Sequence, residues 1–221
     1  RDMAPNFHQT FIESGLLRRQ RLEAVAGLQM WVGCDFEAIW RGCEALPGCE
    51  GANPPYWSAL WPGGLALATH VIKQPELMTH ARVLDLGAGS GVCALAARKA
   101  GASYVLAADI DPQACAAVRL NAQLNSLEVD VTAEDVLAQP AVDFDVILAG
   151  DLWYERFFAH RVSQWLYDQA QRGVTVWLGD SGRAHFPRSR TEELASYQLE
   201  ANPQLEASGQ VHGKVHRFKA R

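Results

Sequence analysis

The feature that most limits the possible folds of this chain is the alternation of apolar and helical segments from residue 64 onward. Strands are predicted for the apolar segments at residues 82–86, 104–108, 129–132, 144–150 and 174–178. Helices are predicted between and before them, at residues 64–74, 91–101, 112–125 and 155–172. Weaker strands at 197–200 and 211–219, after a helix near 188–196, bring the predicted sheet to seven strands. Because the main strands are apolar throughout, helices should cover both faces, which predicts an α/β fold with a doubly wound, mostly parallel sheet.

The first fifty residues follow a different pattern. Their apolar side chains recur near the helical period, namely Leu16, Leu17, Leu22, Val25, Leu28 and Trp31. Residues 46–55 are rich in Pro, Gly and Asn, which is typical of a loop. We therefore expect an N-terminal helical extension over residues 1–52, followed by one domain over residues 53–221.

Charge and cysteine content narrow the possible partners. The net charge of the 221 residues is −5, and only residues 183–221 are basic, with 7 Lys and Arg against 4 Asp and Glu. This balance disfavours nucleic acid as a partner, whereas the basic tail could face an acidic protein. No apolar run approaches the roughly 20 residues that span a membrane, and no signal peptide is visible. Five cysteines without a C-x-x-C pattern indicate reduced thiols. We expect a cytoplasmic monomer with no metal site.

Carboxylates follow each of the main predicted strands. They are Asp85, Asp109, Asp135, Asp151 and Asp180. In a doubly wound sheet the ligand binds beyond the carboxyl ends of the strands, at the point where the strand order reverses. The strand ends are therefore the predicted binding site.

A glycine loop follows the first main strand. Gly87, Gly89 and Gly91 can adopt positive φ and let a ligand approach the backbone closely. The dinucleotide fingerprint G-x-G-x-x-G/A has its third small residue at the position of Val92, whereas the glycines here follow the spacing G-x-G-x-G. A nucleotide oxidoreductase is therefore disfavoured. Asp85, directly before the loop, suits a cationic ligand better than a pyrophosphate.

The next two carboxylates are placed as adenosine binding requires. Asp109 closes the second strand and could bind both ribose hydroxyls, and Asp135 could accept a hydrogen bond from an adenine amino group. Each alone could equally be a helix cap or a solvated loop residue. Their order after the glycine loop favours binding of an adenosine ligand.

These motifs resemble a known family. Residues 83–91 (VLDLGAGSG) resemble the first motif of class I, or seven-β-strand, S-adenosylmethionine-dependent methyltransferases, and the resemblance runs from about residue 53 to 186. Four further segments resemble the lysine methyltransferases of the electron transfer flavoprotein β-subunit, at residues 55–64, 108–112, 150–154 and 179–183. The resemblance implies a Rossmann-like fold, S-adenosylmethionine as methyl donor with S-adenosylhomocysteine as product, and a lysine of that β-subunit or a similar protein as acceptor.

The resemblance also implies a set of functional residues. Asp151 and Tyr154 match a D-x-x-Y motif, and we expect them to be catalytic, Asp151 orienting the amine and Tyr154 forming an aromatic wall. The residues expected to bind the cofactor are Trp57, Trp61, Asp85, Gly87, Gly89, Gly91, Asp109, Ile110, Asp135 and Asp151. Trp153 is a further loop tryptophan that could make a cation–π contact. The structural alternative for Asp151 is a cap on the helix starting near Glu155.

Several other functions remain open from the residues. Asn53-Pro54-Pro55-Tyr56 reads like the N-P-P-Y motif of amide and base methylating enzymes, but that motif follows the fourth strand and here precedes the first. We expect Tyr56, Trp57 and Trp61 instead to form a wall over the donor. The acceptor could be another protein or a small amine. A non-catalytic protein that binds the donor is a third alternative, disfavoured by the intact acidic and glycine positions.

Overall fold

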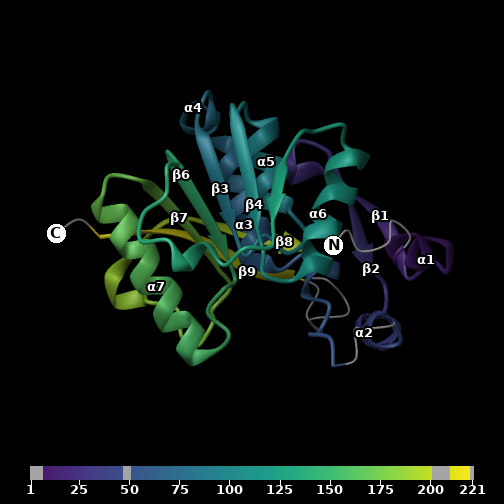
Figure 1. The fold of residues 1–221 in the computed structure, drawn as a ribbon. Helices are drawn as coiled ribbons and strands as arrows, with labels where there is room; N and C mark the ends of the chain where they lie inside the picture. The colour runs from purple at the N-terminus through teal and green to yellow at the C-terminus, as the bar shows by residue number, and fades with distance from the viewer. Residues whose placement is uncertain (1–6, 47–50, 201–209, 220–221) are drawn as a thin grey trace.

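The computed structural model describes residues 7–46, 51–200 and 210–219, and it confirms the α/β fold (Figure 1). Among these residues the central sheet has seven strands in the order β5-β4-β3-β6-β7-β9-β8. The strands are β3 (Arg82–Leu86), β4 (Tyr104–Ala108), β5 (Asp130–Thr132), β6 (Val146–Gly150), β7 (Thr175–Asp180), β8 (Thr191–Glu200) and β9 (Gln210–Phe218). The strands β3 to β7 pair in parallel, whereas β9 pairs antiparallel with both β7 and β8.

Helices cover both faces of this sheet, as the apolar strands require. They are α3 (Pro62–Lys73), the short α4 (Pro75–Met78), α5 (Val92–Lys99), α6 (Pro112–Leu124) and α7 (Arg156–Gln171). Side chains of α3, α5 and α6 form one core cluster with one sheet face, for example Leu67, Leu95 and Val118. Residues of α7, including Val162 and Leu166, form a second core cluster with the opposite face. Alternate residues of each strand therefore enter different cores.

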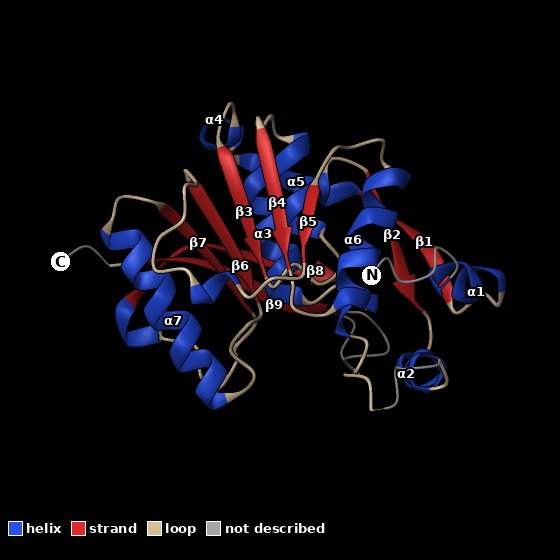
Figure 2. Cartoon of the chain, in the orientation of Figure 1, coloured by secondary structure: helices blue, strands red, loops and turns tan. Residues whose placement is uncertain are grey.

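The strand order creates a crevice at one edge of the sheet. β3 lies between β4 and β6. After β3 the chain adds β4 and β5 on one side of it, and then returns to add β6 and β7 on its other side. The arrows of β3 and β4 run in the same direction and end at the same edge (Figure 2). The loops after β3, β4 and β6 therefore meet at the switch point of the sheet.

The N-terminal segment is not the helical extension that its sequence predicts. It contains α1 (Phe7–Glu13), a hairpin of β1 (Leu17–Leu22) and β2 (Leu28–Gly33) joined through the 3₁₀ turn η1 (Glu23–Val25), and α2 (Phe36–Glu44). The helical expectation is wrong for the hairpin because Leu28, Met30 and Val32 are buried at alternate positions, which is the period of a strand. Ala26 and Gly27, both at positive φ, permit the tight reversal.

The hairpin is held against α6 by two asparagines one helical turn apart. Asn121 and Asn125 accept hydrogen bonds from the backbone amides of Trp31 and Gln29, at 2.8 and 2.9 Å, and Asn125 also donates to the Gln29 carbonyl. These contacts satisfy backbone groups of β2 that have no strand partner on that side. The hairpin residues share a core cluster with α3 and α5, and a domain boundary at residue 52 stays a prediction.

The C-terminal part also departs from its local sequence. The helix predicted near residues 188–196 is wrong, because β8 begins at Thr191 after a short 3₁₀ turn, η4 (Arg188–Arg190). Glu192, Glu193 and Leu194 favour a helix locally, but Glu192 and Glu193 pair with β9, and the register shifts at Leu194 before pairing resumes at Ala195. The strands predicted at 197–200 and 211–219 are confirmed within β8 and β9.

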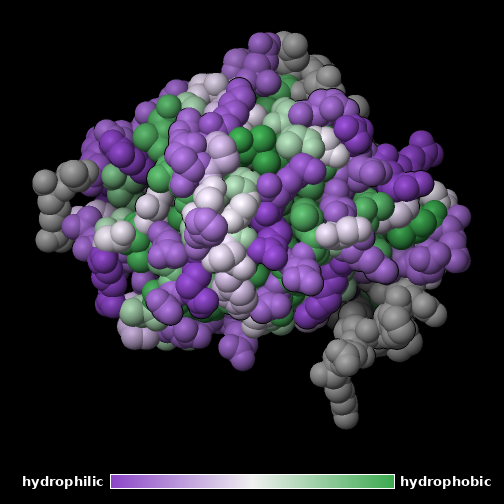
Figure 3. Space-filling model, turned by 90° about the horizontal axis from the view of Figure 1, so that it is seen from above, coloured by the Kyte–Doolittle hydropathy of each residue, from purple (hydrophilic) through white to green (hydrophobic). Residues whose placement is uncertain are grey.

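The surface carries mixed side chains. On the face seen in Figure 3, hydrophilic residues surround small, separate apolar patches. None of the helices in the described ranges has the length and apolar character that crossing a bilayer requires.

Candidate functional site

A cavity of about 620 Å³ lies at the carboxyl ends of the parallel strands. Most of the site residues predicted from the sequence line it: Trp57, Trp61, Gly87, Gly89, Asp109, Ile110, Asp135, Asp151 and Tyr154. Asp85 and Gly91 are not part of the lining. The fold thus brings together side chains from loops that are up to about a hundred residues apart in the chain.

One end of the cavity is built by the glycine loop and Asp109. Gly87, Gly89 and Gly91 all have positive φ, at 65°, 52° and 82°, which only glycine adopts readily. The Asp109 carboxylate accepts a hydrogen bond from the Gly89 amide at 2.9 Å and from the Asp111 amide at 3.0 Å. Burial raises the pKa of Asp109, and these two hydrogen bonds oppose the shift. Each carboxylate oxygen retains acceptor capacity for a hydroxyl group.

Asp85 and Gly91 support this loop from behind. Asp85 is 2 % exposed, and its carboxylate accepts a hydrogen bond from the Ala94 amide of α5 at 2.9 Å. Burial raises the pKa of Asp85 to about 7. A side chain at Gly91 would meet Val118 of α6 at 3.0 Å. Both residues therefore serve the packing of the loop on its helices in this structure.

Asp135 and Ile110 lie further along the same wall. Asp135 accepts a hydrogen bond from the Leu137 amide at 3.0 Å and pairs with Arg161 at 2.7 Å. Ile110 follows Asp109 directly and is 68 % exposed. An exposed isoleucine at a cavity wall is an apolar surface available to a flat ligand.

Asp151 connects three loops at the centre of the site. Its carboxylate accepts hydrogen bonds from the Gly64 amide at 2.8 Å and the Ser181 hydroxyl at 2.9 Å, and it lies 3.5 Å from the Arg183 guanidinium. A side chain at Gly63 would lie 2.6 Å from this carboxylate, so glycine is required there. Asp151 therefore links the start of α3 to the ends of β6 and β7.

The backbone and electrostatics of Asp151 are also unusual. Its φ is +54°, a left-handed conformation that costs free energy in a residue other than glycine and is often found at functional sites. Burial raises the pKa of Asp151, while Arg183 and the Gly64 amide oppose the shift. The alternative role as a helix cap is wrong, because Glu155 caps α7 by accepting hydrogen bonds from the Phe157 and Phe158 amides.

Aromatic side chains surround the other end of the cavity. The ring of Tyr56 lies 5.9 Å from that of Trp61 and 5.7 Å from that of Tyr154, and the ring of Phe158 lies 6.2 Å from that of Tyr154. Tyr56 and Tyr154 are 43 % and 56 % exposed. We call these four residues the aromatic rim. Burial raises the pKa of the Tyr154 phenol, which therefore stays neutral.

Arg183 and Phe158 were not identified from the sequence as site residues. The Arg183 guanidinium lies 5.3 Å from the centre of the Trp61 ring and pairs with Asp151. Arg183 comes three residues after the end of β7. A search of the first three residues after each predicted strand would have identified it. Asp180 itself does not line the cavity: its carboxylate accepts hydrogen bonds from the Gly182 and Arg183 amides and closes a turn.

The tryptophans divide between the cavity and the core. Trp57 lines the cavity but is 2 % exposed, with its indole 4.6 Å from the His8 ring. Trp153 is fully buried, donates to the Ser163 hydroxyl at 2.9 Å and packs against Phe186. The expectation of a cation–π role for Trp153 is therefore wrong. Trp153 lies in the core, whereas the next residue, Tyr154, lines the cavity. The sequence pattern does not reveal which of the two side chains faces the cavity.

The N-P-P-Y segment lies at the cavity without forming a permuted fold. Asn53, Pro54 and Tyr56 contribute to the lining, but they precede α3, whereas residues 151–154 follow β6. Tyr56, Trp57 and Trp61 all line the cavity, and the expected wall over the donor stays a prediction. Within the described residues no group of three or more His, Cys, Asp or Glu is arranged to hold a metal ion.

Comparison with known proteins defines the class. The profile of the ribosomal protein L11 methyltransferase (PrmA) family matches residues 66–152, the part that holds the glycine loop, Asp109 and Asp151. A structure from Pyrococcus abyssi, a tRNA (uracil-54, C5)-methyltransferase in complex with S-adenosylhomocysteine, is similar with a TM-score of 0.54 at 13 % identity, covering 91 % of this chain and 44 % of its own. A protein of Pyrococcus horikoshii, titled as a proposed RNA methyltransferase, has a TM-score of 0.56 at 16 % identity, covering 76 % and 90 %. Fold and site together define a class I S-adenosylmethionine-dependent methyltransferase.

A more similar relative narrows the class to one family. The electron transfer flavoprotein β-subunit lysine methyltransferase of Xenopus laevis is 37 % identical over 192 residues, which cover 84 % of this chain and 76 % of the relative. The chain belongs to this family of methyltransferases.

Proposed function

We propose that this protein transfers methyl groups from S-adenosylmethionine to a lysine side chain of the electron transfer flavoprotein β-subunit. The acceptor is the one named for the relative from Xenopus laevis. One observation carries the proposal: a single cavity joins the glycine loop and Asp109 to the aromatic rim. Such a cavity can hold a nucleoside donor at one end and admit a long side chain at the other.

The cavity fits the donor in size and chemistry. A side chain built at Gly89 would meet no atom within 4 Å, so the loop faces open space where a ligand can approach its backbone. The volume of about 620 Å³ lies within the usual range for small-molecule sites. In the proposed arrangement Gly87 and Gly89 contact the amino-acid part of the donor, Asp109 the ribose, and Ile110 and Asp135 the adenine.

The aromatic rim prepares the acceptor. When bound, S-adenosylmethionine supplies an activated methyl group on a positively charged sulfur. A lysine must enter the reaction as a neutral amine, whereas its usual pKa is about 10.4. The rings of Tyr56, Trp61 and Tyr154 remove the lysine head group from water and so lower that pKa. The proton leaves to solvent at the rim, where Tyr154 is 56 % exposed.

Asp151 and Tyr154 position the amine in this proposal. The Asp151 carboxylate is held by Gly64, Ser181 and Arg183, so the backbone after β6 has little freedom to move. Tyr154, three residues later, contacts the aliphatic stem of the lysine and turns its nitrogen towards the donor. In-line displacement depends steeply on such alignment. No side chain of this site needs to act as a covalent nucleophile.

We further propose that the protein acts as a monomer in the cytoplasm, on a protein and not on nucleic acid or a membrane. Cys34, Cys93 and Cys115 are free thiols, which supports a reducing compartment. The net charge of −5 supports a protein acceptor over a polyanion.

The test is direct methylation of purified acceptors. The protein is incubated with isotope-labelled S-adenosylmethionine and the purified flavoprotein β-subunit, and mass spectrometry locates the labelled lysine. Purified ribosomal protein L11 and free lysine serve as competing acceptors. We expect label in the β-subunit and none in the other two. Label in L11 or free lysine alone would overturn the proposed acceptor.

A further inference from the structure

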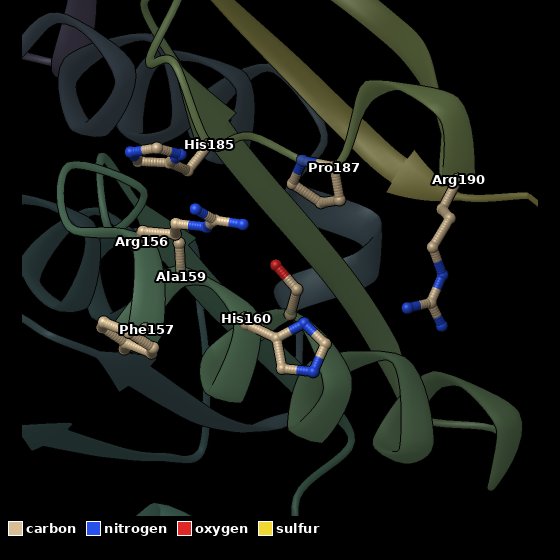
Figure 4. A pocket seen from close by; sticks show the side chains of 8 residues that line it. Arg156, Phe157, Ala159, His160, His185, Pro187 and Arg190 are labelled. Atoms are coloured by element: carbon tan, nitrogen blue, oxygen red, sulfur yellow. The ribbon is translucent and has the colours of Figure 1, made fainter.

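A second cavity lies between the N-terminal half of α7 and the segment that follows β7. It has a volume of about 480 Å³ and is lined by Arg156, Phe157, Ala159, His160, Ser163, His185, Pro187 and Arg190. Figure 4 shows the basic side chains arranged around it, from the start of α7 and from the segment after β7. We call this cavity the basic groove. Two arginines and two histidines line it, and no carboxylate does.

Arg156 stands where a cation is unfavourable for its own helix. It is the first residue of α7, and the helix dipole disfavours positive charge there by about 0.3–1 kcal/mol. Arg156 is exposed, and it forms no ion pair with any residue of the part of the chain that the structure describes. Its charge therefore remains available to an external anion.

Arg190 presents a second cation from the other wall. Its guanidinium stacks on Tyr167, 4.0 Å from the ring centre, and its Nη1 donates to Gln164 at 3.4 Å. Neither partner is a carboxylate, so the Arg190 charge is held in place without being neutralised. Asp168 of α7 accepts a hydrogen bond from the Gln164 side chain at 2.8 Å, and Glu155, the N-cap of α7, is engaged by the amides of the first helical turn.

The groove also offers one apolar anchor. Phe157 is 83 % exposed, the largest exposed fraction among the big hydrophobic side chains of the described residues. An exposed phenylalanine between basic groups suits a segment that carries both carboxylates and an apolar side chain. The bases of a single-stranded nucleic acid can also stack on such a ring, so an oligonucleotide is the competing ligand in the test below.

The groove and the cavity of the proposed reaction share the first turn of α7. Glu155 and Phe158 line the cavity, while Arg156 and Phe157 line the groove. A protein that inserts a lysine past Tyr154 can therefore reach the groove with a neighbouring segment.

We propose that the basic groove binds an acidic segment of the methylated protein, with an apolar side chain of that segment against Phe157. This inference rests on the proposed function, because it assigns how the same site selects its acceptor. Carboxylates of the acceptor pair with Arg156 and Arg190, and this contact raises the local concentration of the lysine at the aromatic rim.

The first experiment measures binding in the absence of methylation. A fluorescent ten-residue peptide with six glutamates and one leucine is titrated with the full-length protein, beside a lysine-for-glutamate version and a single-stranded oligonucleotide of equal charge. We expect the acidic peptide to bind and the Arg156→Glu variant to bind it about tenfold more weakly. Arg172→Glu, with the same charge change at the other end of α7, should bind like the wild type. A glutamate at the first turn suits the helix dipole, so Arg156→Glu should fold.

The second experiment measures catalysis on the flavoprotein β-subunit. Arg156→Glu should raise KM about tenfold and leave kcat and the affinity for S-adenosylmethionine unchanged. Equal peptide binding by the wild type and Arg156→Glu, or tighter binding of the oligonucleotide than of the acidic peptide, would overturn the groove proposal. Wild-type protein that binds the peptide but does not methylate the β-subunit would overturn the acceptor and support the groove.

Discussion

The two ends of the cavity are built in different ways. The donor end consists of the glycine loop and the carboxylates that follow it, all within residues 85–135, and in its key contact the Gly89 amide donates to the Asp109 carboxylate. The acceptor end assembles Tyr56, Trp61, Tyr154, Phe158 and Arg183 from three separate segments. Its geometry depends on Asp151, which links the start of α3 to the ends of β6 and β7.

This difference indicates how each end should respond to change. The donor end depends on turn chemistry and backbone hydrogen bonds, so single substitutions there should alter cofactor affinity. The acceptor end depends on alignment across loops, so substitutions there should alter transfer or KM while cofactor affinity is kept.

The largest effect is expected at Asp151. Asp151→Asn should lower single-turnover methyl transfer on the order of 100-fold, because the amide nitrogen cannot accept one of the two hydrogen bonds that align the loops and the charge facing Arg183 is lost. Asparagine tolerates the positive φ at this position, so thermal melts should show a folded protein. Ser181→Ala, which removes one of the hydrogen bonds, is the control and should lose less. If Asp151→Asn transferred methyl groups at the wild-type rate, the acceptor lysine would be positioned by other residues than those that Asp151 aligns.

The next effect is expected at the donor end. Asp109→Ala removes a charged acceptor for two ribose hydroxyls and should weaken S-adenosylmethionine binding by about 1.5–3 kcal/mol, measured by calorimetry. Asp111→Ala is the matched control, since Asp111 caps α6 by accepting from the Gln113 amide at 2.8 Å. It should lose about 1 kcal/mol of stability with little change in affinity. Unchanged affinity in Asp109→Ala would rule out the ribose assignment.

A smaller effect is expected at the aromatic rim. Tyr154→Ala should raise KM for the protein acceptor by about three- to tenfold, because one wall for the lysine stem is lost. Tyr154→Phe keeps the ring and should behave like the wild type. Steady-state kinetics with saturating cofactor separate KM from kcat. If both variants lost transfer equally, the phenol hydroxyl and not the ring would be the functional group.

The smallest functional effect is expected at Asp85, behind the glycine loop. Its pKa is raised to about 7 in the folded protein, above the ordinary value of 3.8. The folded state therefore holds the proton more tightly, and the wild type should lose stability as pH rises from about 4 through 7. Asp85→Asn should remove this part of the pH dependence, measured as melting temperature against pH. Its cofactor affinity should change less than that of Asp109→Ala. A larger loss would place Asp85 in direct contact with the donor.

The prediction that residues at the carboxyl ends of the strands form the site succeeded where the residues come from neighbouring strands. Glycines at positive φ and a carboxylate at the end of the next parallel strand must meet, because neighbouring strands end at the same edge. It failed for Trp153, which follows a strand end but turns into the core beside Ser163. The direction of a side chain after a strand depends on backbone angles such as the positive φ of Asp151, which no apolar pattern encodes.

The alternation of apolar strands and helices was enough to determine the parallel sheet and the position of the donor end, because burial on both faces dictates the pattern residue by residue. The N-terminal hairpin and β8 were decided by tertiary structure. Residues 17–33 form strands since Asn121 and Asn125 satisfy the backbone of β2, and residues 191–200 form one since β9 lies beside them. The acceptor end likewise exists only in the folded chain, where Trp61 and Arg183, more than a hundred residues apart, are brought within contact distance. The basic groove exists only where α7 packs beside the segment after β7.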